Sequence, residues 1–118
     1  MSASISNLYV NSAYANAVDV TRPYSETQEV ERKLLLALGA RVRELRLKQG
    51  LSQEAFADHC GVHRTFMGTI ERGESNLSFY NLAKVSRGLG ISLSQLLTGL
   101  EERALKLSAT NRVRKPSV

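Results

Sequence analysis

The chain has 118 residues, a mass of 13.0 kDa, a formal net charge of +5 and a sequence pI near 9.7. This length suits one small domain, its single cysteine excludes an internal disulfide framework, and it contains neither a signal-peptide pattern nor an apolar run long enough to span a membrane. We therefore expect a cytoplasmic protein without a membrane segment, whose excess of basic side chains favours a polyanionic partner.

The amino-terminal segment is rich in Ser, Asn and Ala and has no sustained helical or strand period. Residues 1–25 are therefore predicted to form a poorly ordered N-terminal arm, and a tail without function stays open as the alternative.

A first helix is predicted from about Glu26 to Gln49. Ser25 and Gln28 have the spacing of a capping box, and Gly50 is suited to end the helix. Apolar residues recur at helical spacing, namely Val30, Leu34, Leu38, Val42 and Leu45. Three basic residues fall outside this stripe and are expected on a solvated face, where some could touch phosphate: Arg41, Arg43 and Lys48.

Two short helices follow. Ser52 is a suitable N-cap for a helix to about His59, which Gly61 ends, with Ala55, Phe56 and Cys60 turned inward. A second short helix is expected from His63 to Arg72, closed by Gly73. Helices this short need packing partners to persist, so the two are predicted to pack against each other and the flanking helices as one rigid unit.

Two more helices complete an all-α, five-helix domain over residues 26–107. Ser78 caps a helix to about Leu89, which Gly90 ends, and Ser92 with Gln95 forms a capping-box pair for a helix through Lys106. The inward residues expected on the earlier of these helices are Phe79, Leu82, Val85 and Leu89. Residues 108–118 are predicted to be a basic disordered tail.

The helix from His63 to Arg72 has two chemically different faces. At 100° per residue, Phe66, Met67 and Ile70 fall on one side and are predicted to pack. The opposite side carries Arg64, Thr65, Gly68, Thr69 and Arg72. Arginine can grip guanine through two hydrogen bonds and threonine can meet a thymine methyl, while a glycine leaves room for close approach. The alternative is an ordinary solvated face, although such a face normally carries Glu and Lys.

The segment LSQEAFADHCGVHRTFMGTIERGESNLSFYNLAKVSRGLGISLSQLL resembles the XRE, or Cro/repressor-type, helix-turn-helix family over about residues 34–100. Its most specific pieces are LSQEAFA, the CGV turn and TIERGE. Within that family, HRTFMG and ERGESN are most similar to small controller proteins of restriction-modification systems. The resemblance implies a lambda-repressor-like DNA-binding domain whose helix-turn-helix is formed by helices 2 and 3, and a repressor or controller of transcription as the function.

The resemblance also implies roles for individual residues. Gln53 would bond a phosphate and brace the recognition helix, and Arg46 would pair with Glu71 in a structural ion pair. Bases would be reached by Arg64, Thr65 and Thr69, and the DNA backbone would lie near Arg72 and Asn76. Two positions depart from the family's usual pattern: His63 stands where Ser or Thr often caps the helix, and Ser75 where controller-like relatives often have Arg. The expected DNA-binding set is Gln53, His63, Arg64, Thr65, Gly68, Thr69, Arg72 and Asn76.

A homodimer is expected, because one recognition helix contacts only a few base pairs and two copies would match a pseudo-palindromic operator in double-stranded DNA. The predicted interface is Leu93, Leu97 and Leu100 on the last helix, which is more apolar than one small core needs. The alternative is that these leucines are all core residues.

The chain is predicted not to be an enzyme and to bind no cofactor, since it contains no Gly-rich phosphate loop, zinc-ligand quartet or nucleophile-base pattern. His59, Cys60 and His63 are close in sequence, but Cys60 is expected in the core and no metal site is predicted. An antitoxin-like protein that binds both DNA and a partner toxin is the competing function.

Overall fold

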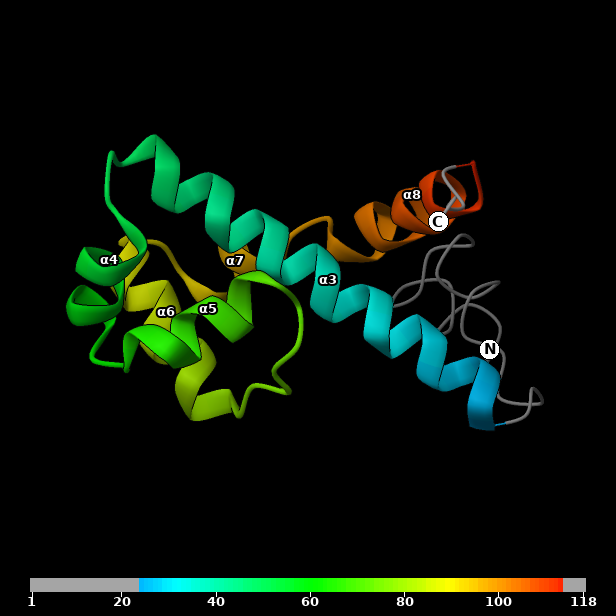
Figure 1. The fold of residues 1–118 in the computed structure, drawn as a ribbon, viewed down its shortest axis with the longest axis horizontal. Helices are drawn as coiled ribbons and strands as arrows, with labels where there is room; N and C mark the ends of the chain where they lie inside the picture. The colour runs from blue at the N-terminus through cyan, green and yellow to red at the C-terminus, as the bar shows by residue number, and fades with distance from the viewer. Residues whose placement is uncertain (1–23, 114–118) are drawn as a thin grey trace, which may run out of the picture.

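The computed structural model describes residues 24–113, and these residues form an all-helical arrangement, as the sequence predicts (Figure 1). The predicted arm over residues 1–25 lies outside the described residues except for its last two positions. The helices are α3 (Tyr24–Lys48), α4 (Gln53–Cys60), α5 (Arg64–Glu71), α6 (Phe79–Leu89), α7 (Leu93–Leu97) and α8 (Leu100–Val113).

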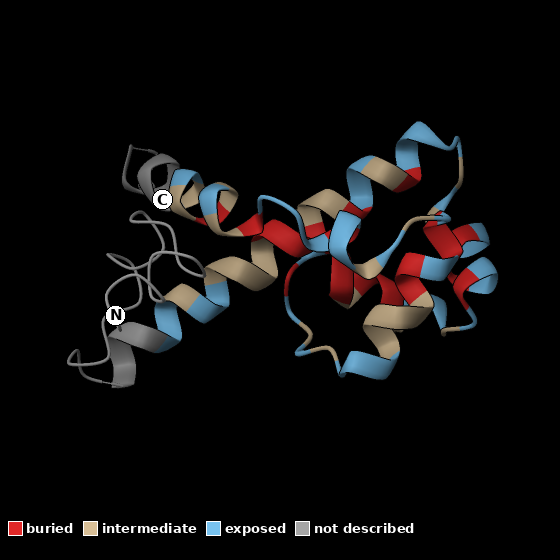
Figure 2. Cartoon of the chain, turned by 180° about the vertical axis from the view of Figure 1, so that it is seen from behind, coloured by how far each residue is buried: buried red, intermediate tan, exposed pale blue. Residues whose placement is uncertain are grey.

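The domain is assembled around the carboxyl-terminal half of α3. In Figure 1, α4, α5, α6 and α7 gather on this half, and the amino-terminal half of α3 extends past them. The helix α8 diverges from this amino-terminal half of α3. Figure 2 shows the buried residues concentrated where the helices meet. The largest fully buried side chains are Phe56, Met67, Ile70, Leu96, Val42, Val85 and Cys60. The predicted domain thus corresponds to α3, α4, α5 and α6 together with α7 and the first part of α8, which form the last predicted helix in two pieces.

Local sequence signals set most helix ends. The Ser52, Ser78 and Ser92 side chains each accept a hydrogen bond from a backbone N–H of the following helix, and Gln95 completes the capping box with Ser92. These bonds satisfy backbone donors that the first turn of a helix leaves without partners. The glycines predicted to end helices all have positive φ, namely Gly50, Gly61, Gly73 and Gly90.

Three predictions of local structure are wrong. The helix α3 begins at Tyr24, so Ser25 lies inside its first turn and is not its N-cap. Ala55 is exposed, and Ala57 occupies the core in its place. Phe79 is 72% exposed, because the first turn of α6 projects beyond the helices that bury Val85 and Leu89.

The last predicted helix is divided in two at Gly99. Its φ of +76° cannot be accommodated in a right-handed helix, and the Thr98 hydroxyl donates to the carbonyl of Ser94 at 2.6 Å where α7 ends. Beyond this break, α8 buries Leu100 and Ala104 and continues to Val113. The predicted tail thus overlaps the last turns of α8, whose bounds reach Val113. The rest of the predicted tail lies outside the described residues.

Polar contacts attach the last two helices to α3. The Arg41 guanidinium donates to the carbonyl oxygens of Leu96 at 2.8 Å and Gln95 at 2.7 Å. Arg41 is therefore a structural residue and not part of the solvated basic face that the sequence predicted. Arg103 on α8 donates to Glu44 on α3, and this bond holds the pKa of the Glu44 carboxyl below its usual value.

Candidate nucleic-acid interface

The helices α4 and α5 form a helix-turn-helix whose turn is residues 61–63. Gly61 takes the left-handed conformation after α4, and the Val62 backbone N–H donates to the carbonyl of Ala57 at 3.0 Å. His63 then caps α5, because its Nδ1 accepts the Thr65 backbone N–H at 3.0 Å. The imidazole thus takes the place of the Ser or Thr hydroxyl that usually caps a helix.

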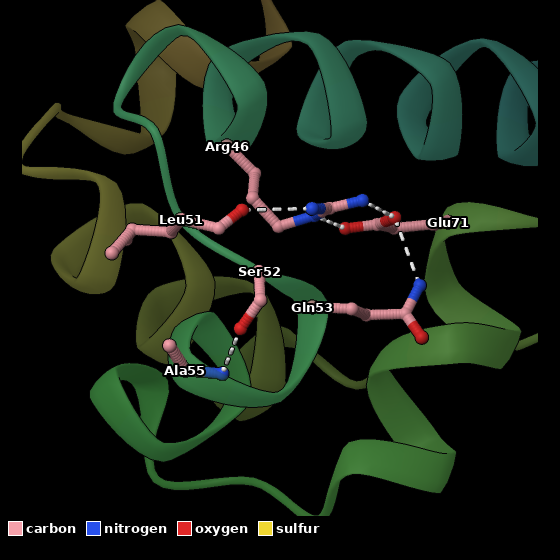
Figure 3. Close-up of polar contacts among 6 residues, drawn as sticks. All are labelled: Arg46, Leu51, Ser52, Gln53, Ala55 and Glu71. Carbon is pink, nitrogen blue, oxygen red and sulfur yellow. Dashed lines mark hydrogen bonds and ion pairs between the residues drawn. The ribbon is translucent and has the colours of Figure 1, made fainter.

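A buried ion pair fixes the end of α5 to α3 (Figure 3). Arg46 donates to both carboxylate oxygens of Glu71, from Nε at 2.7 Å and from Nη2 at 2.9 Å. Its Nη1 donates to the carbonyl of Leu51 at 2.9 Å, and the Gln53 amide donates to Glu71 at 3.0 Å. The hydrogen bond to Glu71 raises the pKa of Arg46 above its ordinary value. Because two hydrogen bonds join the guanidinium to the carboxylate, the pair fixes the orientation of α5 relative to α3 as well as the distance between them.

Gly39 allows α3 and α5 to approach more closely than side chains would permit. A Cβ at this position would lie 2.4 Å from the carbonyl oxygen of Ile70 and 2.6 Å from that of Glu71. Both atoms belong to the backbone of α5. Together with the Arg46 pair, this contact fixes the position of α5 against the core.

The first turn of α5 presents its predicted outer residues. Arg64 and Thr65 are both exposed, whereas Met67 and Ile70 are buried and Phe66 is half-buried. Arg64 Nη1 lies 3.5 Å from Glu54 Oε1 on α4, an ion pair open to water. Glu54 was not predicted as a site residue, because the partners are ten positions apart on different helices, and only the turn at residues 61–63 brings them together.

Thr69 is less available than the helical wheel predicts. Its side chain is half-buried, and its hydroxyl donates to the carbonyl of Phe66 at 2.7 Å. Since that bond uses the only hydroxyl hydrogen of Thr69, the close contact with the Ser75 hydroxyl makes Ser75 the donor. The methyl group of Thr69 is consequently the part suited to a base contact.

Gly68 is buried, which contradicts the prediction of an open position in the middle of the outer face. A Cβ there would meet Arg72 Nη1 at 3.2 Å and Gln53 Oε1 at 3.4 Å. Two polar side chains therefore cover the glycine, one from the end of α5 and one from the start of α4. Asn76, in the segment after α5, is exposed.

The three leucines of the predicted dimer interface have different environments. Leu100 is only 6% exposed and belongs to the core, Leu93 is half-buried, and Leu97 is 38% exposed. Leu97 faces a cleft of about 920 Å³ between the amino-terminal half of α3 and the start of α8. Apolar lining comes from Leu34, Leu35, Leu38, Leu97 and Leu100.

Cys60 is fully buried, and burial raises the pKa of its thiol to about 11. The thiolate, which is the form that attacks electrophiles or binds metals, is therefore disfavoured. Within residues 24–113, no three His, Cys, Asp or Glu side chains are grouped so that they could hold a metal ion. None of the described helices is both long enough and apolar enough to cross a membrane.

Comparison with known proteins identifies the class. Residues 42–96 match the model of the helix-turn-helix family HTH_3, and the chain belongs to this family of transcription regulators. It is similar to the control protein C.BamHI of Bacillus amyloliquefaciens, with 44% identity over 63 residues, 52% of this chain and 78% of the relative. The control protein C.MunI of a Mycoplasma species is 43% identical over 68 residues, 57% of this chain and 92% of the relative.

A solved structure supports the same relationship. The restriction-modification controller protein C.AhdI from Aeromonas hydrophila superimposes with a TM-score of 0.51 and 42% identity, over 52% of this chain and 94% of that one. The resemblance that the sequence suggested, to XRE-type regulators and to controller proteins among them, is confirmed.

Proposed function

We propose that this protein binds double-stranded DNA in a sequence-specific manner, as a homodimer, and thereby regulates transcription as a controller or repressor. The observation that carries the proposal is the rigid attachment of α5: Arg46 and Gly39 hold its inner side while Arg64 and Thr65 are exposed on its outer side. A helix held in this way can enter a major groove with its side chains already in position. The likeness to three control proteins supports the regulatory role.

Base recognition is assigned to the first turn of α5, with phosphate contacts beside it. Arg64 is suited to bidentate bonding with guanine, and the Thr65 and Thr69 methyl groups are suited to thymine. The Gln53 side chain lies at the start of α4, where it already braces Glu71. We assign Gln53 to a phosphate contact, which positions the protein on the duplex but does not select the sequence. Asn76, for which the resemblance implies a place near the DNA backbone, also lines the cleft beside α7.

The partner for dimerisation is assigned to the cleft beside α7. Leu97 is exposed at its edge, and the cleft carries apolar side chains from both α3 and α8. A second copy related by a two-fold axis would cover this apolar area and place two α5 helices on half-sites about one helical turn apart.

Arg64→Ala is expected to relax base preference at one position of each half-site. Loss of a good bidentate contact costs about 1 to 3 kcal/mol for the preferred base and little for the other bases. Competition binding against single-base variants of the preferred site measures this difference. Arg87→Ala, an exposed change on α6, is the control and should leave the preference intact. Unaltered base preference in Arg64→Ala would show that Arg64 does not recognise a base.

Leu97→Asp is expected to give a folded monomer with weaker binding to the full site. A carboxylate at this position would have to be desolvated in the interface, whereas in the single chain it stays in contact with water. Sedimentation measures the oligomeric state, and circular dichroism checks the fold. Ser94→Asp, an exposed change on the same helix, is the matched control. A variant that sediments as the wild type does would place the interface elsewhere. Leu100 is unsuitable for this test because its burial in the core would unfold the variant.

A further inference from the structure

The middle of the outer face of α5 is occupied by a side chain that comes from the helix end. Gly68 falls at the centre of this face, between the directions of Arg64 and Thr65, yet it is buried. The atom closest to the position of a Cβ at Gly68 is Arg72 Nη1, at 3.2 Å. The glycine is therefore a slot on the outer face, and the Arg72 guanidinium lies against it.

The conformation of Arg72 explains how its side chain reaches this slot. Arg72 is the C-cap of α5 and keeps a right-handed helical backbone, with φ −84° and ψ −2°. Side chains on a helix lean toward its amino terminus, so Arg72 extends back over the residue one turn earlier. A Cβ at position 68 would lie 3.2 Å from Arg72 Nη1, so the guanidinium would have to shift by a few tenths of an ångström.

The guanidinium keeps hydrogen-bonding capacity in this position. Its Nε pairs with Glu74 Oε1 at 3.1 Å, and 59% of the Arg72 side chain is exposed. A guanidinium has five N–H donors, of which four belong to the two terminal nitrogens. Glu74 therefore orients the group from the Nε side, and the terminal nitrogens are on the side that can form two bonds to one acceptor pair.

We propose that Arg72 is a base-reading residue that determines specificity, and that Gly68 is a positioning residue that admits its guanidinium to the reading face. The inference rests on the proposed function and extends it. Its ligand is the guanine edge in the major groove, where O6 and N7 accept two hydrogen bonds from one arginine. The face would then carry two arginines, Arg64 at the start of α5 and Arg72, whose guanidinium lies beside Gly68, about one turn along the helix from Arg64. A phosphate contact, which the family resemblance implies for Arg72, is the competing role.

The test compares four variants on the site selected by the wild-type protein and on its single-base variants. Arg72→Ala removes the group, and Arg72→Lys keeps the charge but loses the two-point geometry. Gly68→Ala adds a Cβ that shifts the Arg72 guanidinium by a few tenths of an ångström and meets only the flexible ends of two side chains, so the thermal midpoint should not fall. Gly68→Ala combined with Arg72→Ala tests whether the two residues act together.

Both Arg72 variants should lose roughly 5- to 150-fold in preference for guanine at the same position. Gly68→Ala should lose preference at that position to a smaller extent, and the double variant should lose no more than Arg72→Ala. The dependence of binding on salt should be nearly unchanged in Arg72→Lys. Uniform weakening on every sequence by Arg72→Ala, with the logarithmic salt slope shallower by about 0.9, would assign Arg72 to a phosphate and overturn the inference. Unchanged preference in a folded Gly68→Ala would also overturn it. Failure of the wild-type protein to select any sequence would instead refute the proposed function.

Discussion

Glu71→Ala is expected to lower the free energy of unfolding by about 3 to 5 kcal/mol, because it leaves the buried Arg46 guanidinium without its carboxylate. The side chains of Arg46 and Glu71 are only 8% and 3% exposed, so water does not replace the lost partner. The Gln53 amide loses its acceptor as well. A loss of this size is a large part of the 5 to 15 kcal/mol that typically stabilises a domain. Denaturant unfolding followed by circular dichroism measures it.

The control for this variant is Glu29→Ala. Glu29 pairs with Arg32 at the surface of α3, where ion pairs are worth about 0 to 1 kcal/mol. Replacing both buried partners, as in Arg46→Met with Glu71→Met, should recover much of the loss, because no uncompensated charge is left inside. A cost below about 1 kcal/mol for Glu71→Ala would show that the pair does not hold α5 to α3.

Gly39→Ala is expected to destabilise the domain by about 1 to 3 kcal/mol, although alanine has the higher helix propensity by about 1 kcal/mol. The new Cβ would lie 2.4 Å from the Ile70 carbonyl oxygen, and ordinary contact begins at 3.4 Å. The obstructing atoms are backbone, so α5 must move as a unit. Its displacement should weaken binding to the preferred site as well as lower stability.

Gly68→Ala is the matched control for Gly39→Ala. It makes the same change on the neighbouring helix, but its Cβ meets only side-chain ends. Thermal unfolding should therefore show a lower midpoint for Gly39→Ala and an equal or higher midpoint for Gly68→Ala. A stabilised Gly39→Ala would mean that α3 and α5 are not held at the close approach described.

Most helix ends could be predicted because they depend on neighbouring residues alone. The caps Ser52, Ser78 and Ser92 each bond a backbone N–H three residues later in the chain. Phe79, by contrast, has the helical spacing of a core residue, and its exposure depends on how far the other helices extend along α6. The role of Arg41 as a donor to α7 is equally invisible in sequence, because its acceptors are backbone carbonyls more than fifty residues away.

The sequence likewise predicts part of the candidate site. The helical period alone separates exposed Arg64 and Thr65 from buried Met67 and Ile70. It does not show that Arg72 folds back over Gly68, since the path of a long side chain depends on its rotamers and on Glu74. Nor does it show that the Thr69 hydroxyl is already bonded within the helix. The helical wheel therefore gives the direction in which a side chain points, and the structure shows which of its hydrogen-bonding groups are already used within the protein.

Selection of bound DNA from a random double-stranded pool at two salt concentrations tests the central claim most directly. If the outer side of α5 enters the major groove in a dimer, the selected sequences should share two inverted half-sites about one helical turn apart, and affinity should fall as salt rises. Recovery of a pool with no enriched sequence, or of a site whose preference does not respond to changes on α5, would contradict the account.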